Sequence, residues 1–114
     1  MWHWEEGRQQ SGYYKMCLAR GKFWDLYILK YAKGAYIKRH FDYVPDGYEH
    51  HRINFTLLRA EQGGTFFKMV KGKKIYFSSR FANFRPDIEI HGVSKIAKGA
   101  RYVLSIGWIK TGWH

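Results

Sequence analysis

The clearest strand pattern lies near the C-terminus, in Arg101-Tyr102-Val103-Leu104-Ser105-Ile106-Gly107-Trp108. Large apolar or aromatic side chains occupy every second position there: Tyr102, Leu104, Ile106 and Trp108. The other face is less apolar and carries Arg101 and Ser105. Because successive side chains of a strand point to opposite faces, this period of two predicts a β-strand with two unlike faces.

The same composition extends through the rest of the chain. Segments rich in β-branched and aromatic residues recur between glycines, a spacing typical of short strands joined by turns. The other predicted strands are Phe23 to Tyr31, Ala35 to Val44, Arg52 to Arg59, Thr65 to Val70, Lys74 to Phe77 and Ile88 to Val93. Helical periodicity is poor throughout, and the only candidate for a turn or two of helix is Glu5 to Leu18. We therefore predict a mainly β chain folded as a sandwich or barrel.

Length and composition predict one globular domain. The chain has 114 residues, of which 46% are hydrophobic and 19% aromatic, so it has enough apolar surface to form a core. No apolar run approaches the roughly 20 residues of a membrane-spanning helix, so no membrane partner is expected. A single cysteine, Cys17, excludes an internal disulfide and a cysteine-based zinc site. The expected compartment is the cytoplasm.

The charge balance is strongly basic. Twenty Lys and Arg residues against nine Asp and Glu residues give a formal net charge of +11. Such a field attracts nucleic acid, anionic surfaces or acidic small molecules, and it does not distinguish among them.

A candidate metal-binding motif occurs in His40-Phe41-Asp42. In a strand, His40 and Asp42 point to the same face, where both could reach one ion. With one more nitrogen ligand they would form a two-histidine, one-carboxylate set, which leaves coordination positions open and suits Fe(II). Taken alone, the motif is better explained as a polar pair at the end of a strand, because such triplets arise often by chance.

The second half of the chain supplies the other candidates. His91 ends the predicted strand Ile88 to Val93, and Arg101 opens the strand described first. A guanidinium in a half-buried strand requires a partner, and a carboxylate is the natural one. Because few acidic residues of the chain are candidates, an organic acid bound inside the barrel could fill that role.

Two shorter features have structural interpretations. Arg85 and Asp87 flank Pro86, and we expect them to form a supporting ion pair. His50 and His51 follow a turn-rich segment and are secondary candidates for contacting a substrate.

Taken in order, these residues resemble a known enzyme family. The matching positions are Tyr31, Gly34, His40-Phe41-Asp42, Arg52, Gly63-Gly64-Thr65-Phe66, His91-Gly92-Val93, Gly99-Ala100-Arg101 and Trp108. This pattern, over residues 27 to 110, resembles the iron(II)- and 2-oxoglutarate-dependent dioxygenases, in particular the prolyl-hydroxylase-like branch. The resemblance implies a double-stranded β-helix (a jelly roll, cupin-like) with little helix. It implies a single domain over residues 1–114, with a core at about 23–110.

The resemblance also implies a site. Iron would be held by His40, Asp42 and His91, and Arg101 would bind the distal carboxylate of 2-oxoglutarate. Tyr31 and Ser105 look like hydrogen-bond donors to that cosubstrate. Dioxygen is the other cosubstrate of such enzymes, and ascorbate is a candidate reductant. The chain departs from the pattern at Arg59, which stands where members often have a tyrosine that contacts the cosubstrate.

Three functions follow as hypotheses. The first is hydroxylation of a C–H bond on a protein or peptide side chain, with release of succinate and CO2, by resemblance to prolyl hydroxylases. The second is the same chemistry on a nucleic-acid base or its methyl group, which the charge of +11 would favour. The third is a non-catalytic basic β-barrel that binds nucleic acid. Substrate-binding residues are unassigned in all three.

Overall fold

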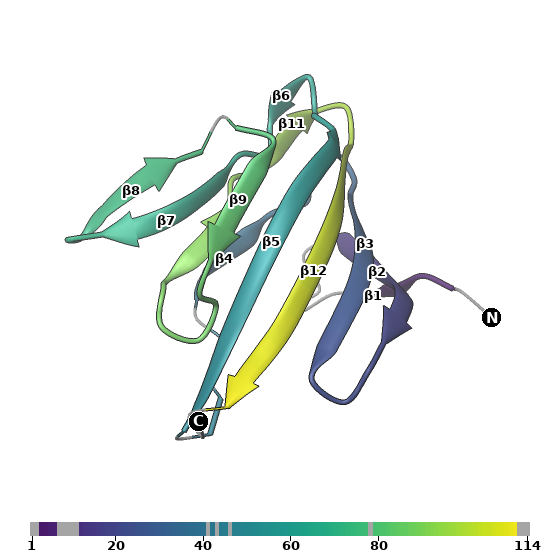
Figure 1. Ribbon diagram of the computed structural model, residues 1–114. Helices are drawn as coiled ribbons and strands as arrows, with labels where there is room; N and C mark the ends of the chain where they lie inside the picture. Colours follow the sequence, from purple (N-terminus) through teal and green to yellow (C-terminus); the bar gives the residue numbers. More distant parts are fainter. Residues whose placement is uncertain are drawn as a thin grey trace.

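The protein folds into antiparallel β-sheets (Figure 1). The computed structural model describes residues 3–6, 12–40, 42, 44–45, 47–77 and 79–111, and none of these is helical. Accordingly, no helix in the described part of the chain could cross a membrane.

The larger sheet holds the two longest strands. Its members are β1 (Glu5–Glu6), β2 (Tyr13–Arg20), β3 (Trp24–Tyr31), β5 (Tyr48–Leu58), β9 (Phe81–Phe84) and β12 (Arg101–Thr111). Their order across the sheet is β1-β2-β3-β12-β5-β9. The C-terminal strand β12 therefore lies between β3 and β5, in the position where it contributes most to the interior (Figure 1).

The smaller sheet packs across the interior from the larger one. Its members are β4 (Ile37–His40), β7 (Phe66–Val70), β8 (Lys73–Tyr76) and β10 (His91–Val93), in the order β4-β10-β7-β8. A short pair, β6 (Gln62–Gly63) with β11 (Ile96–Lys98), lies at one end. Strands distant in sequence are neighbours in both sheets, which is the crossover pattern of a jelly roll.

All seven predicted strands are present, with different ends. The strand predicted over Ala35 to Val44 is only β4, and the one predicted over Ile88 to Val93 begins at His91. Residues 86–88 instead form a turn, in which the Glu89 carboxylate accepts a hydrogen bond from the Arg85 backbone at 2.6 Å. A side chain that satisfies a backbone donor in this way stabilises a turn at the expense of a strand.

The suggestion of helix in Glu5 to Leu18 is wrong. This region contains β1 and β2, and β2 pairs with β3 from Tyr13 to Arg20. The ring of Tyr13 stacks on that of Tyr31, with centroids 5.1 Å apart. Cross-strand pairing of aromatic residues therefore outweighs a weak local propensity.

The interior is lined by the less apolar faces of the central strands. Asn54 and Thr56 of β5 are buried, as are Arg101 and Ser105 of β12, whereas Ile106 is 42% exposed. The apolar core adjoins these polar groups and is formed by Tyr31, Ala35, Ile37, Phe66, Ala82, Phe84, Val93, Ile96 and Val103. Polar groups turned inward are costly unless they have partners, and Ser105 donates here to Asn54.

Candidate metal centre

Three potential metal ligands converge inside the jelly roll. His40 ends β4 and His91 begins β10, and the two residues are direct partners across the antiparallel strands. Their ring centroids are 4.4 Å apart. Asp42 lies just beyond β4, with Oδ1 3.6 Å from His40 Nε2. One ligand atom from each of the three residues lies within 4.8 Å of the others, so they can share one ion.

Backbone carbonyls orient both imidazoles. Nδ1 of His40 donates to the carbonyl of Lys38 at 2.8 Å, and Nδ1 of His91 donates to the carbonyl of Glu89 at 2.8 Å. Because a carbonyl only accepts, each ring carries its proton on Nδ1 and its lone pair on Nε2. Metal-binding histidines are held in this way in proteins, with one nitrogen on the ion and the other on a carbonyl or carboxylate.

The ligand set fits a divalent transition metal. Two neutral imidazoles and one carboxylate leave positions open for reactants, which is the arrangement of non-haem Fe(II) oxygenases. The ring of Phe84 lies 4.8 Å from that of His91 and the ring of Phe66 lies 6.1 Å from it, between centroids. These phenyl groups give the centre one apolar wall, which limits access of water.

Backbone carbonyl groups of the turn after β9 accept hydrogen bonds from two of the three potential ligands. The carbonyl of Pro86 accepts the Asp42 backbone N–H at 2.6 Å, and the carbonyl of Glu89 accepts the His91 ring proton. The Glu89 carboxylate is fixed in turn by the Arg85 backbone and by Lys68 Nζ at 3.0 Å. A displacement of this turn would therefore move both ligands.

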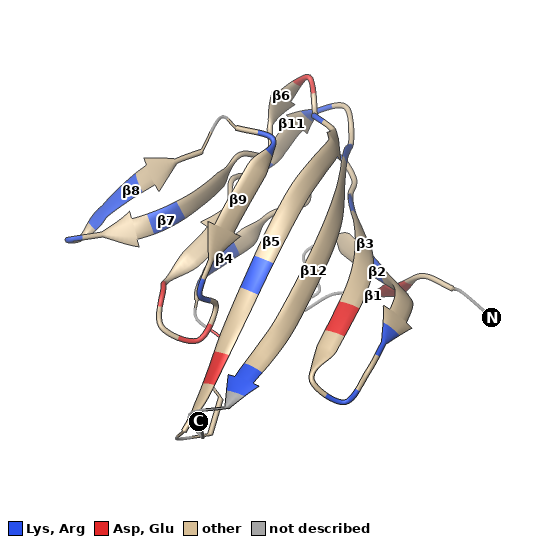
Figure 2. Ribbon diagram, in the orientation of Figure 1, with Lys and Arg blue, Asp and Glu red and all other residues tan. Residues whose placement is uncertain are grey.

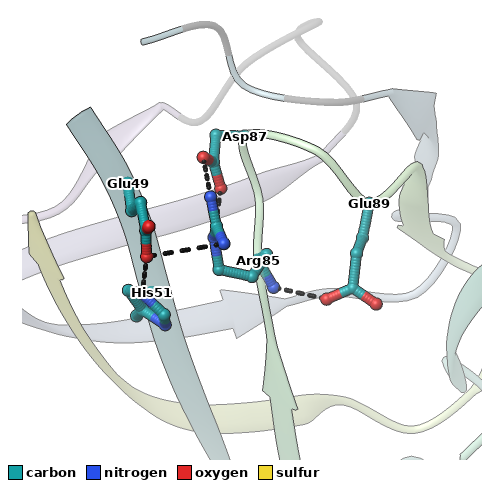
Figure 3. A network of polar contacts seen from close by, with 5 residues as sticks. All are labelled: Glu49, His51, Arg85, Asp87 and Glu89. Atoms are coloured by element: carbon teal, nitrogen blue, oxygen red, sulfur yellow. Dashed lines mark hydrogen bonds and ion pairs between the residues drawn. The ribbon is translucent and has the colours of Figure 1, made fainter. Parts of the chain in front are cut away.

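Ion pairs fasten the same turn to β5 (Figure 3). Arg85 makes two hydrogen bonds to Asp87, of 2.9 and 2.6 Å, and its Nη1 lies 3.6 Å from Oε1 of Glu49. Glu49 also accepts from Nε2 of His51 at 3.0 Å. The predicted ion pair of Arg85 with Asp87 is confirmed, and it supports the geometry of the metal ligands.

The carboxyl groups of this network have lowered pKa values. Burial raises the pKa of Asp87, but hydrogen bonds from Arg85 and from the backbone of His50 and Asp87 outweigh it, so the net shift is downward. The hydrogen bond from His51 lowers the pKa of Glu49. Both groups are therefore ionised at neutral pH, as their ion pairs require.

A cavity of about 420 Å³ opens beside the three ligands. Tyr31 and Ser105 both line it. His50 lines it as well, whereas His51 stacks on Trp108 at a centroid distance of 5.6 Å. Burial lowers the pKa of His50, and the charge of Arg52 lowers it further, so this imidazole is neutral at pH 7.

A polar chain crosses the floor of this cavity. Arg52 donates to Ser105 Oγ at 2.7 Å and to Asp25 Oδ1 at 2.6 Å, and Ser105 donates to Asn54. Sequence analysis did not assign roles to Arg52, Asn54 or Asp25. The signal was present, because Arg52 and Asn54 share the polar face of an alternating strand, and that face points inward.

Arg101 lies in a neighbouring cavity of about 280 Å³. The two cavities are adjacent, because Asn54 and Phe66 line both. Arg101 is 4% exposed, and its Cζ lies 4.9 Å from the ring centroid of Tyr31, its partner across the strands. Burial raises the pKa of Tyr31, and Arg101 partly opposes the shift.

The guanidinium of Arg101 is not fully satisfied. Its Nη1 is buried and makes no hydrogen bond within the described part of the chain. A buried donor without an acceptor costs about 1–3 kcal/mol, and more when charged. An anionic ligand would supply that acceptor, so this position fits a carboxylate. Arg59, the residue that departs from the family pattern, lines the same cavity.

Comparison with known proteins identifies the fold. No protein-family model and no curated protein sequence matches the chain. KdgF from Halomonas sp. is 17% identical, with a TM-score of 0.58 over 92% of this chain and 84% of that one. A cupin-2 domain, Rru_A2000 from Rhodospirillum rubrum, is 13% identical, with a TM-score of 0.61 over 94% and 69%.

A hydroxylase has the same architecture. A Pseudomonas putida prolyl-4-hydroxylase is 20% identical, with a TM-score of 0.63 over 77% of this chain and 50% of that one. This chain therefore spans half the length of that enzyme. At such identities the likeness concerns the fold alone, and with the observed strand order it leads to one conclusion: the chain is a jelly roll of the cupin type.

Proposed function

We propose that the protein is an Fe(II)- and 2-oxoglutarate-dependent dioxygenase that hydroxylates a C–H bond, on a protein or peptide side chain. The observation that carries the proposal is the convergence of His40, Asp42 and His91 with both imidazoles already fixed by backbone carbonyls. Iron held by these residues would supply chemistry in which dioxygen oxidises both molecules: one oxygen atom would enter succinate as 2-oxoglutarate loses CO2, and the other would enter the substrate as a hydroxyl group.

The side chains have distinct roles in this proposal. His40, His91 and Asp42 hold the metal and leave one side of it open toward the cavity. Arg101 binds the distal carboxylate of 2-oxoglutarate, and this assignment is supported by its burial and by its unsatisfied Nη1. Tyr31 lines the cavity next to the metal and donates a hydrogen bond to the cosubstrate. Ser105 lines the same cavity, but its hydroxyl already donates to Asn54 and accepts from Arg52, so it orders these polar side chains beside the cosubstrate.

The substrate class rests on likeness to prolyl hydroxylases. The pattern of residues resembles that branch, and a prolyl-4-hydroxylase has the same architecture. The metal cavity, at about 420 Å³, also suits a side chain together with a small diacid.

The test begins with binding. Anaerobic addition of Fe(II) and 2-oxoglutarate is expected to give a weak visible charge-transfer band and, on exposure to air, succinate. His40→Ala should abolish both signals. The matched control is His3→Ala, because His3 lies outside the ligand set and its side chain is 72% exposed. Absence of the band in the wild type, or an unchanged band in His40→Ala, would refute the proposal.

The substrate is identified by mass. Proline-containing peptides and single-stranded oligonucleotides are incubated with Fe(II) and with or without 2-oxoglutarate. The proposal expects a gain of one oxygen atom on a peptide that depends on the cosubstrate. Oxidation of the oligonucleotide alone would reassign the substrate to nucleic acid.

A further inference from the structure

The smaller sheet carries charge of one sign. Its described strands contain five cationic residues and no acidic ones: Lys38, Arg39, Lys68, Lys73 and Lys74. Figure 2 shows blue segments and no red ones on β4, β7 and β8, whereas β5 of the larger sheet carries both colours. In the sequence, no acidic residue occurs between Glu61 and Asp87. The strands of the smaller sheet therefore carry positive charge only, whereas those of the larger sheet carry both signs.

Part of this charge lines a groove of about 660 Å³. Its cationic residues are Lys38 and Arg39 of β4, Lys74 of β8 and Lys95, which follows β10. All four side chains are exposed, and no residue lining the groove is acidic. The groove adjoins the metal cavity, because the buried side chains of Ile37 and Val93 line both.

Gly92 leaves space for the ring of Phe67, which lines the groove. Gly92 pairs with Phe67 across β10 and β7. A Cβ atom at position 92 would lie 2.6 Å from Cζ of Phe67 and 2.5 Å from the carbonyl oxygen of Ile37. The Phe67 ring therefore packs directly against the β10 backbone, and Lys74 Nζ lies 4.7 Å above its centroid. This cation–π contact holds the ammonium group over the groove.

Three of the four groove cations have no carboxylate partner among the residues that the structure describes. Within the described ranges, Arg39, Lys74 and Lys95 have no carboxylate within ion-pair distance. Lys68, which belongs to the same sheet, does have one, at 3.0 Å in Glu89. Lys68 therefore supports the candidate metal centre through Glu89, whereas Arg39, Lys74 and Lys95 are available to an external anion.

We propose that this groove binds the phosphate backbone of a single-stranded nucleic acid. Neighbouring strands lie about 4.8 Å apart, so the four-stranded sheet spans about 14 Å from β4 to β8. A stacked DNA strand has a phosphate about every 3.4 Å, which places about four phosphates over that span. Four cations line the groove, of which Arg39, Lys74 and Lys95 have no carboxylate partner in the described part of the chain. The half-buried ring of Tyr36 lies beside them for base stacking.

An acidic polypeptide matches the groove less well. Side chains on the same face of an extended peptide are about 6.7 Å apart, so the same span would present about two carboxylates. The denser charge of nucleic acid therefore fits four cations better. Because the groove lies outside the metal ligands, this binding does not depend on the oxygenase proposal and requires no metal.

The test measures binding without metal. A fluorescent oligodeoxythymidylate of about 12 nucleotides is titrated with the full chain at several salt concentrations. With four phosphate contacts, the slope of log K against log salt is expected to be about −2.8. The groove variant K38Q/R39Q/K74Q/K95Q should bind at least about 10-fold more weakly, with a slope near zero.

The matched control removes four exposed lysines from elsewhere: K22Q/K33Q/K98Q/K110Q. Its net charge equals that of the groove variant, and its affinity should stay within about 3-fold of the wild type if location matters more than net charge. Circular dichroism confirms that both variants are folded. Equal loss of affinity in the two variants would overturn the proposal, as would competition by polyglutamate as effective as that by unlabelled oligonucleotide.

Discussion

His40 and His91 are partners across two antiparallel strands, with their ring centroids 4.4 Å apart. Fifty residues separate them in the sequence, and the pairing of β4 with β10 brings them together. The shortest antiparallel pairing in the smaller sheet is thus also the one that assembles the metal centre. The orientation of the two imidazoles depends on the backbone carbonyl groups of Lys38 and Glu89, at the ends of these strands.

The Glu89 side chain is expected to control metal affinity without touching the metal. It anchors the turn whose carbonyl groups hold His91 and Asp42, through the Arg85 backbone and Lys68. Glu89→Ala should weaken metal binding by about 10- to 100-fold, as is usual for groups behind metal ligands. Competition with a chelating dye measures the affinity.

The control is Glu61→Ala, because Glu61 pairs with Lys98 on the surface and is 65% exposed at its side chain. An unchanged affinity in Glu89→Ala would mean that the turn does not position the ligands.

Replacing Arg101 is expected to weaken the binding of 2-oxoglutarate and to leave the binding of the metal unchanged. Arg101→Gln removes the charge and leaves the three metal ligands in place. Loss of a charged hydrogen bond of about 1.5–3 kcal/mol predicts a dissociation constant for 2-oxoglutarate about 10- to 100-fold higher. Metal affinity without the cosubstrate should be unchanged. A variant that binds both ligands as tightly as the wild type would remove Arg101 from the site.

The guanidinium of Arg52 lies against β12 in space that is free because Gly107 has no side chain. A Cβ atom at position 107 would lie 2.1 Å from Nη2 of Arg52 and 2.5 Å from its Cζ. Gly107→Ala should therefore displace the guanidinium from Asp25 and Ser105 and destabilise the fold by about 1–3 kcal/mol. Chemical denaturation measures the free energy of unfolding.

A double-mutant cycle isolates the cause. In an Arg52→Ala background the collision is absent, so adding Gly107→Ala should cost little more. Simple additivity of the two changes would show that Gly107 matters for a reason other than Arg52.

Asp87 is expected to stabilise the fold in a pH-dependent way. Its pKa is lowered in the folded protein, whereas an unfolded Asp titrates near 3.9. The stabilisation is therefore complete above about pH 4 and is lost as the pH falls through the folded-state pKa. At neutral pH, Asp87→Asn should be less stable by about 1–3 kcal/mol.

Thermal unfolding from about pH 7 to pH 2 tests this expectation, because the difference between wild type and Asp87→Asn should shrink below about pH 4. A difference that is constant over the whole range would assign the effect to packing.

The strands were predictable because their alternation is local. Period-two patterns around Arg52 and Arg101 located the central strands, and the resemblance indicated the topology that unites His40 with His91. The orientation of each face was harder to predict, because apolar residues such as Ile106 point outward here and polar ones such as Asn54 point inward. A polar interior inverts the usual relation between hydrophobicity and burial.

Contacts made by the backbone were beyond sequence reasoning. The ion pair of Arg85 with Asp87 followed from residue types, but the carbonyl groups of Pro86 and Glu89 hold the ligands whatever side chains they carry. The placement of Arg101 in a second cavity depends on how Phe66 and Asn54 divide the interior, which is a matter of packing between distant segments.

The carbonyl groups that orient His40 and His91 have a consequence for how the protein acquires its ion. Both rings are aimed by contacts within the chain, so little rearrangement is needed when the ion arrives. Loading should thus be a separate event from folding, and chelators should strip the centre reversibly while the jelly roll stays intact.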